Sequence, residues 1–214
     1  MGFELVHPFY LPLYNDAVAP ELALPDLGNP HHLAILIGNT RSLWAPFTKA
    51  MRDDTALAAH SDPLDTYTQR AIFAALERAG LTYEVRFYWE EPPRRAAFSL
   101  MAHVSGLAWL SPTYLAIHPT FGPWIGLRAA VVIALDGLEE PNTAAASCHN
   151  CEAKCHPALQ RVQAMSKAKG VSSQSIKVNP EPWISLRAAC PIGREHRFSR
   201  AQTLFHYTHQ FEGG

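Results

Sequence analysis

Three of the chain's cysteines lie within eight residues, in the segment CHNCEAKCHP at 148–157. Cys148, Cys151 and Cys155 have the spacing C-x2-C-x3-C, and Cys190 stands directly before Pro191. Four thiolates complete the tetrahedral ligand set of a zinc ion or of a 4Fe-4S cluster. Closely spaced cysteines also form disulfides or redox-active C-x-x-C pairs. The segment therefore has four candidate chemistries.

The spacing favours a 4Fe-4S cluster among these candidates. Structural zinc sites usually combine two C-x2-4-C knuckles, whereas this chain has a run of three cysteines and one remote cysteine beside a proline, as in cubane-cluster sites. A thioredoxin-type pair follows a strand, and the polar, alanine-rich residues before Cys148 predict none. We predict that Cys148, Cys151, Cys155 and Cys190 bind a 4Fe-4S cluster. Zinc, thiols without a metal and disulfides remain the alternatives.

Other catalytic motifs are missing from the sequence. It has no Ser–His–Asp order, no glycine-rich phosphate loop and no HExxH motif, so nothing supports a hydrolase. No individual catalytic residue can be named from the residue pattern. The chain is nevertheless rich in histidine, with 11 residues, several of them beside prolines, which slightly favours metal or anion chemistry.

Composition limits the class of protein that carries these cysteines. The 214 residues are 48% hydrophobic and 17% charged, which is enough for one sizeable core. A formal net charge of -1 does not favour nucleic-acid binding. No apolar run reaches the roughly 18 residues that a membrane span requires, and the first residues lack the pattern of a signal peptide. We therefore expect a cytoplasmic protein, in which clustered cysteines bind metal or do redox work.

Hydrophobic periodicity predicts the elements that must position the cysteines. Strands are expected where short apolar or alternating runs occur, and helices where apolar residues recur every three to four positions. We predict strands over 32–38, 81–89, 113–117 and 126–135, and helices over 41–52, 61–80, 94–107, 156–168 and 199–210. The strands 113–117 and 126–135 are predicted to form an antiparallel pair. Residues 170–182 are predicted to form a loop.

These elements indicate an α+β fold with a single domain. Residues 1–140 would form the core, and residues 141–214 would form a cysteine-containing segment that packs on it. The 17 prolines and the low charge argue against a helical bundle and favour layers with many connections.

Residues 102–133, AHVSGLAWLSPTYLAIHPTFGPWIGLRAAVVI, carry a resemblance to a known family. The pieces AHVxG and IHPxFGxW, with the apolar strand after them, resemble the CblC-type cobalamin-processing proteins. Upstream, GFELVHPFYLPLYND, LAILIGNTRSLWAPFTKAM and DPLDTYTQ are similar to segments of the same family, and so is WISLRAACPIGREHRFSRAQTLFHYT downstream. The order of these pieces along the chain carries the resemblance, because no single motif is diagnostic.

The resemblance implies a flavin-nitroreductase-like mixed sheet with helices around a large corrin cavity. It also implies reductive removal of the upper axial ligand of cobalamin, with flavin or glutathione as electron donor. By the same resemblance, His118, Phe121, Gly122 and Trp124 would lie near the cobalamin, and Arg187 would receive glutathione. A reductase or a cobalamin-trafficking protein would be a partner, and a homodimer is an option that the sequence leaves open.

The cysteine segment resembles that of a second family, epoxyqueuosine reductase. Its ferredoxin-like half has a C-x2-C-x3-C-P run and a separate cysteine, and both serve 4Fe-4S clusters beside the corrin. CblC-type proteins of animals lack this set of four cysteines. We therefore predict a cobalamin reductase with a 4Fe-4S cluster as electron relay. The alternative is a non-catalytic cobalamin-binding trafficking protein with a structural zinc site formed by the four cysteines.

Overall fold

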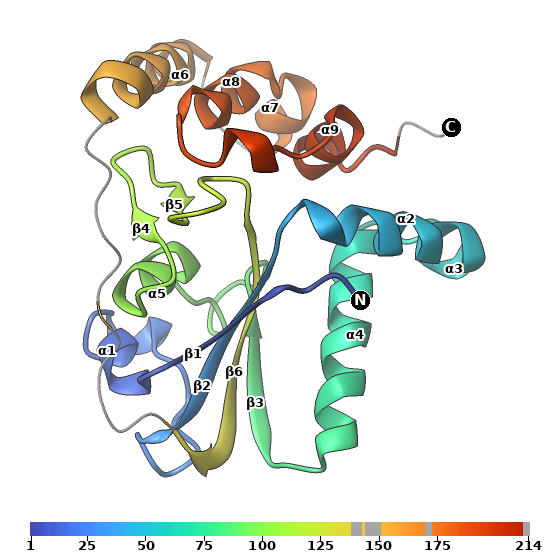
Figure 1. Cartoon of the computed structure of the whole chain (residues 1–214), viewed down its shortest axis with the longest axis vertical. Helices are drawn as coiled ribbons and strands as arrows, with labels where there is room; N and C mark the ends of the chain where they lie inside the picture. The colour runs from blue at the N-terminus through green and yellow to red at the C-terminus, as the bar shows by residue number, and fades with distance from the viewer. Residues whose placement is uncertain (138–142, 144–150, 170–172, 212–214) are drawn as a thin grey trace.

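The computed structural model describes residues 1–137, 143, 151–169 and 173–211, and a four-stranded sheet runs through its centre (Figure 1). The strand order is β1-β2-β6-β3, and every pair in it is antiparallel. The strands are β1 (Leu5–Phe9), β2 (His32–Asn39), β6 (Gly126–Asp136) and β3 (Tyr83–Phe87). The expected α+β class is confirmed, with antiparallel pairing throughout the described strands in place of a mixed sheet.

The central strand β6 is buried on both faces of the sheet. Ala130 and Val132 point into one core, whereas Ala129, Val131 and Ile133 point into another. Successive side chains of a strand alternate between faces, so a strand covered on both sides must be apolar throughout. This explains why residues 129–134 form an uninterrupted apolar run.

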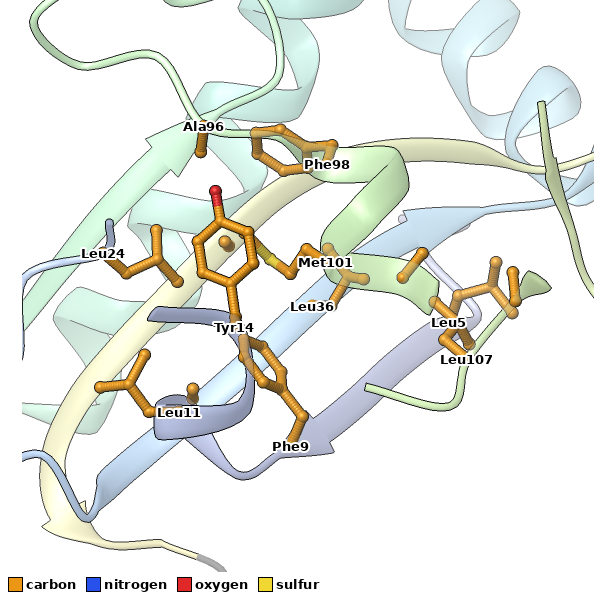
Figure 2. Close-up of a cluster of buried hydrophobic side chains, with 14 of the residues drawn as sticks. Leu5, Phe9, Leu11, Tyr14, Leu24, Leu36, Ala96, Phe98, Met101 and Leu107 are labelled. Carbon is orange, nitrogen blue, oxygen red and sulfur yellow. The ribbon is translucent and has the colours of Figure 1, made fainter. Parts of the chain in front are cut away.

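The helices α1 (Leu11–Asn15) and α5 (Phe98–Val104) cover one face of the sheet. Figure 2 shows Tyr14 in the middle of this core, between Phe9 and Met101. The Tyr14 hydroxyl donates to the Leu22 carbonyl at 2.8 Å and accepts from the Ala97 amide at 2.8 Å. Burial raises the pKa of Tyr14. The ring thereby ties α5 to the N-terminal segment while its polar atom stays paired.

The long helix α4 (Pro63–Ala79) covers the other face. It begins with a proline in its first turn, where the missing N–H has no helical partner to lose, and it ends at Gly80, whose φ is +65°. Ile72 and Leu76, four residues apart, pack on β3 and β6. The predicted helix over 61–80 is confirmed.

The remaining helices lie at one end of the sheet (Figure 1). The short helices α2 (Trp44–Asp53) and α3 (Thr55–Ala58) follow β2. The C-terminal helices lie together beyond the small β4–β5 hairpin (Trp109–Leu110 and Ala116–Ile117). They are α6 (His156–Lys169), α7 (Ser173–Val178), α8 (Glu181–Ala189) and α9 (Arg200–Thr208), with a short π-helix at Cys151–Cys155 and a 3-10 helix at Arg194–His196. None of the described helices combines the length and apolar character needed to cross a membrane.

Two sequence-based predictions of local structure are wrong. The segment 113–117 does not pair with 126–135, because β6 already has β2 and β3 on its two edges, and β5 pairs with β4 instead. The segment 170–182 is not all loop, since α7 and the start of α8 lie within it. Pro182 stands in the first turn of α8, where proline is compatible with a helix. The strand β1 was not predicted.

Candidate functional site

A cavity of about 190 Å³ lies between the sheet core and the C-terminal helices. Its walls come from the end of β3, the start of α5, the β4–β5 hairpin, the beginning of β6, and helices α8 and α9. The lining residues are Tyr88, Phe98, Ser99, Tyr114, Leu115, Ala116, Pro123, Ile125, Gly126, Leu127, Arg128, Arg187 and His206. Residues from both parts of the chain are therefore needed to build it.

A larger cavity of about 630 Å³ adjoins the first. Tyr88, Phe98 and Ser99 belong to the walls of both cavities. Its other lining residues are Glu21, Leu22, Pro92, Arg95, Ala96, Ala97 and Leu100. Binding sites for drug-sized ligands have volumes of roughly 300–1,000 Å³, so the two cavities together can admit a substantial part of a large ligand.

Arg187 on α8 is a buried arginine in the cavity wall, with only 6% of its surface exposed. Its Nε donates to the Pro123 carbonyl at 3.0 Å and its Nη2 donates to the Ile125 carbonyl at 3.1 Å. Its Nη1 is buried and has no partner in the described part of the chain. Burial lowers the pKa of the guanidinium, and the nearby Tyr207 opposes this effect. An unpaired donor at a cavity wall can receive an acceptor group from a ligand.

Arg128 on β6 supplies a second buried guanidinium to the same wall, with 2% exposure. Its Nε donates to the Asn39 side-chain oxygen at 2.6 Å, and its guanidinium lies 5.5 Å from the Tyr88 ring centroid. Among the described residues no carboxylate forms an ion pair with Arg128 or Arg187. Sequence analysis did not identify Arg128, although a charged residue within an apolar strand was a visible signal.

His206 and Asp65 are titratable groups whose environments change their protonation. Burial, with the nearby Arg187 and Arg128, lowers the pKa of His206 well below its ordinary value, so this cavity-lining imidazole is neutral at pH 7. Burial raises the pKa of Asp65 to about 6, and Arg128 opposes this shift. Asp65 lines a small space that also contacts Tyr88, Arg128 and His206. Sequence analysis missed both groups, because their shifts depend on burial and on neighbours from other elements.

His118 does not line the described cavity walls. Its Nδ1 accepts hydrogen bonds from the amides of Thr120 and Phe121, at 3.1 and 3.3 Å. Burial, with His7 and His196 nearby, lowers the pKa of His118. A neutral ring whose Nδ1 is an acceptor carries its proton on Nε2. His118 therefore offers an N–H donor.

Phe121 and Gly122 pack against the C-terminal segment. The Phe121 ring lies 4.8 Å from the ring of His196, in an edge-on arrangement. Gly122 has φ of +57°, and a Cβ added there would lie 2.7 Å from the Ile192 carbonyl carbon. The backbone of Ile192 therefore lies too close to Gly122 to admit a side chain. The ligand roles expected for both residues stay predictions.

Trp124 is a core residue, 3% exposed, next to the cavity wall. Its ring lies 5.8 Å from that of Phe198 and 5.7 Å from the Arg187 guanidinium. Its indole nitrogen is buried with no hydrogen-bond partner in the described residues. Trp124 therefore packs against the guanidinium of Arg187, and its expected contact with a cofactor stays a prediction. Of the five residues predicted to bind the cofactor, only Arg187 lines the cavity.

Cys155 and Cys190 lie in one buried cluster, although they come from segments far apart in the sequence. They are 5% and 3% exposed and pack with Ile117, surrounded by Trp109, Leu115 and Ile192. Leu115 also lines the cavity, so one side chain connects the cysteine cluster with the cavity wall. Cys148 and the side chain of Cys151 lie outside the described residues. Within the described part no group of three metal-binding side chains occurs, so the predicted four-cysteine site stays a prediction.

Comparison with known proteins gives matches among solved structures. No family model and no curated protein sequence matches this chain. Among solved structures, the chain is similar to CblC, a B12-trafficking protein from C. elegans, with a TM-score of 0.69. The match covers 96% of this chain and 85% of that chain, at 19% sequence identity. The protein therefore has a CblC-like fold, as the sequence resemblance predicted.

Proposed function

We propose that this protein binds cobalamin as its substrate and removes the upper axial ligand by reducing the cobalt. The observation that carries the proposal is the likeness of fold to a B12-trafficking protein along 96% of the chain. The motifs of residues 102–133 point independently to the same family. The adjoining cavities supply space, aromatic side chains and hydrogen-bond donors, which a broad ring with an amide rim requires.

Arg187 and Arg128 would orient the bound molecules. A guanidinium donates several hydrogen bonds in one plane, and carboxylates and amides accept them. Arg187 has a free Nη1 at the cavity wall, which fits the expected contact with glutathione or a corrin amide. The proton on Nε2 of His118 supports a hydrogen-bonding role for this residue, because a protonated nitrogen cannot bind cobalt.

Reduction itself would release the ligand. Cobalt(III) holds two axial ligands, and each electron that it accepts weakens axial bonding, so electron delivery and ligand removal are one process. The protein must therefore position the corrin, keep the number of axial ligands low and admit the donor. Glutathione, a reduced flavin and a resident cluster are the donor classes that we consider.

The cysteines are the proposed relay. Cys155 and Cys190 come from different segments into one buried cluster beside the cavity, and this arrangement fits a shared thiolate site. With Cys148 and Cys151 they would form the donor set of a 4Fe-4S cluster, which would supply single electrons. The likeness of the segment to epoxyqueuosine reductase supports this proposal from sequence alone. The same two buried thiols would also suit zinc, so a non-catalytic trafficking protein with a structural four-cysteine zinc site is the second candidate.

Anaerobic purification followed by addition of cyanocobalamin and reductant tests the function. Retention of cobalamin with about four irons per chain and a cobalt(II) absorption spectrum after reduction would support the reductase. Retention with one zinc, no iron and an intact upper ligand would support the trafficking protein. A colourless protein that retains no cobalamin would exclude both candidates. A cytoplasmic location, a homodimer, a protein partner and the division at residue 140 stay predictions.

A further inference from the structure

Tyr114 lies at the tip of the β4–β5 hairpin, in a turn that is fixed from inside. The Tyr114 amide donates to the Ser111 carbonyl at 2.9 Å, and the Ser111 amide donates to the Leu115 carbonyl at 3.0 Å. The hydroxyls of Ser111 and Thr113 are 2.7 Å apart and buried. This network sets the direction of the turn, so the position of Tyr114 does not depend on its own side chain.

The backbone of Tyr114 is unfavourable for a tyrosine. Its φ is +62°, in the left-handed region where glycine and asparagine are preferred. A bulky residue in this conformation is uncommon, and such outliers gather at functional sites. Glycine at this position would let the same turn form without strain.

Contacts of the Tyr114 side chain with the rest of the protein do not offset the cost of this backbone conformation. It is 78% exposed, the highest value among the exposed large hydrophobic residues of the described chain. No hydrogen bond to its hydroxyl and no aromatic contact with its ring occurs among the described residues. Yet Tyr114 lines the cavity together with Arg128 and Arg187. An aromatic ring at a cavity edge offers a flat apolar face to a ligand.

We propose that Tyr114 is a ligand-contacting residue, whose ring packs against the flat face or the edge of the corrin and excludes water there. This inference rests on the proposed function and extends it to a residue that no motif identified. The ligand would provide the burial that the free protein does not give the ring. The strained turn would then present the ring at the cavity mouth before binding.

The test compares hydroxocobalamin affinity and stability for three Tyr114 variants. Tyr114→Gly and Tyr114→Asn both remove the ring and suit the backbone, whereas Tyr114→Phe keeps the ring. We expect the first two to bind hydroxocobalamin about tenfold more weakly in equilibrium dialysis, and to unfold at higher urea concentration than wild type. Tyr114→Phe should bind within about twofold of wild type. Val178→Ser is the control, because Val178 is 76% exposed and lies outside the cavity walls.

The outcomes separate the two proposals. Equal affinity of wild type and Tyr114→Gly would overturn the inference and leave the proposed function intact. Lower stability of Tyr114→Gly would also overturn it, because the ring would then support the fold. If wild type itself retained no hydroxocobalamin, both the inference and the proposed function would be wrong.

Discussion

Gly122 packs closely against the backbone of Ile192 in the C-terminal segment, and replacing the glycine with alanine should disrupt this contact. The glycine has φ of +57°, and an added Cβ would contact the carbonyl oxygen of Ile192 and lie 2.7 Å from its carbon. These are backbone atoms, so no side-chain rotation can relieve the overlap. The opposing Gly193 has φ of +68°, and a Cβ added there would overlap the Phe121 carbonyl and lie 2.6 Å from the Gly122 amide nitrogen. The segment must therefore shift to admit the methyl group.

Gly80 provides a matched control for this substitution. It has φ of +65°, similar to Gly122, but nothing lies within 4 Å of the Cβ position. Alanine in the left-handed conformation costs about 1–2 kcal/mol, so Gly80→Ala should lower the free energy of unfolding by that amount. Gly122→Ala should add overpacking of about 1–3 kcal/mol. The expected difference between the two variants is therefore about 2 kcal/mol.

Urea unfolding followed by circular dichroism measures this difference. With a slope of about 2 kcal/mol per molar urea, the midpoint of Gly122→Ala should lie about 1 M below that of Gly80→Ala. Gly122→Ala should also retain less cobalamin, because Arg187 and His206 approach the cavity from the displaced segment. If the two alanine variants unfolded at the same midpoint, the close packing of Gly122 on Ile192 would be refuted.

Three further predictions concern buried polar groups. Arg187→Met leaves the carbonyls of Pro123 and Ile125 without their donors, so it should lower the free energy of unfolding by about 2–4 kcal/mol. The control Arg197→Met replaces an exposed arginine and should lower it by less than about 1 kcal/mol. Equal effects of the two variants in urea unfolding would contradict a stabilising role of the Arg187 hydrogen bonds. Asp65 has a folded-state pKa of about 6 against an ordinary 3.8, so between these values the folded state holds a proton that the unfolded state has lost. Stability should therefore fall as pH rises from 3.8 to about 6, by up to about 3 kcal/mol, and urea midpoints of Asp65→Asn across this range should lack that contribution; an identical pH profile for both proteins would exclude the shift. If the proposed 4Fe-4S cluster is bound, Cys190→Ser should remove most of the iron that elemental analysis finds in anaerobically purified wild type, while far-ultraviolet circular dichroism stays unchanged. Equal iron in an iron-containing wild type and the variant would exclude Cys190 as a ligand.

Local sequence signals predicted those helices and strands whose start, end and buried face depend only on residues within the element. The helix α4 has a proline start, apolar residues four apart and a glycine end, and each of these signals acts within the element. The strand β2 was visible as an apolar run with β-branched residues. Pairing was less predictable, because the partners of β5 depended on which edges of β6 were already occupied. The short strand β1 was not predicted and contains Pro8. Proline is compatible with a strand at the edge of a sheet, and the position of β1 at an edge is known only from the sheet order.

The sequence alone determined the cysteine spacing, the α+β class and the order of motifs that indicated a CblC-like fold. These features depend on residues close together in the chain or on their order along it. Only the tertiary structure decided which residues meet: Arg128 with Arg187 at one cavity wall, Cys155 with Cys190 in one cluster, and Gly122 against Ile192. It also decided that Tyr114 is strained and exposed. The physical reason is that burial and close contact arise between segments far apart in sequence, which no local pattern records.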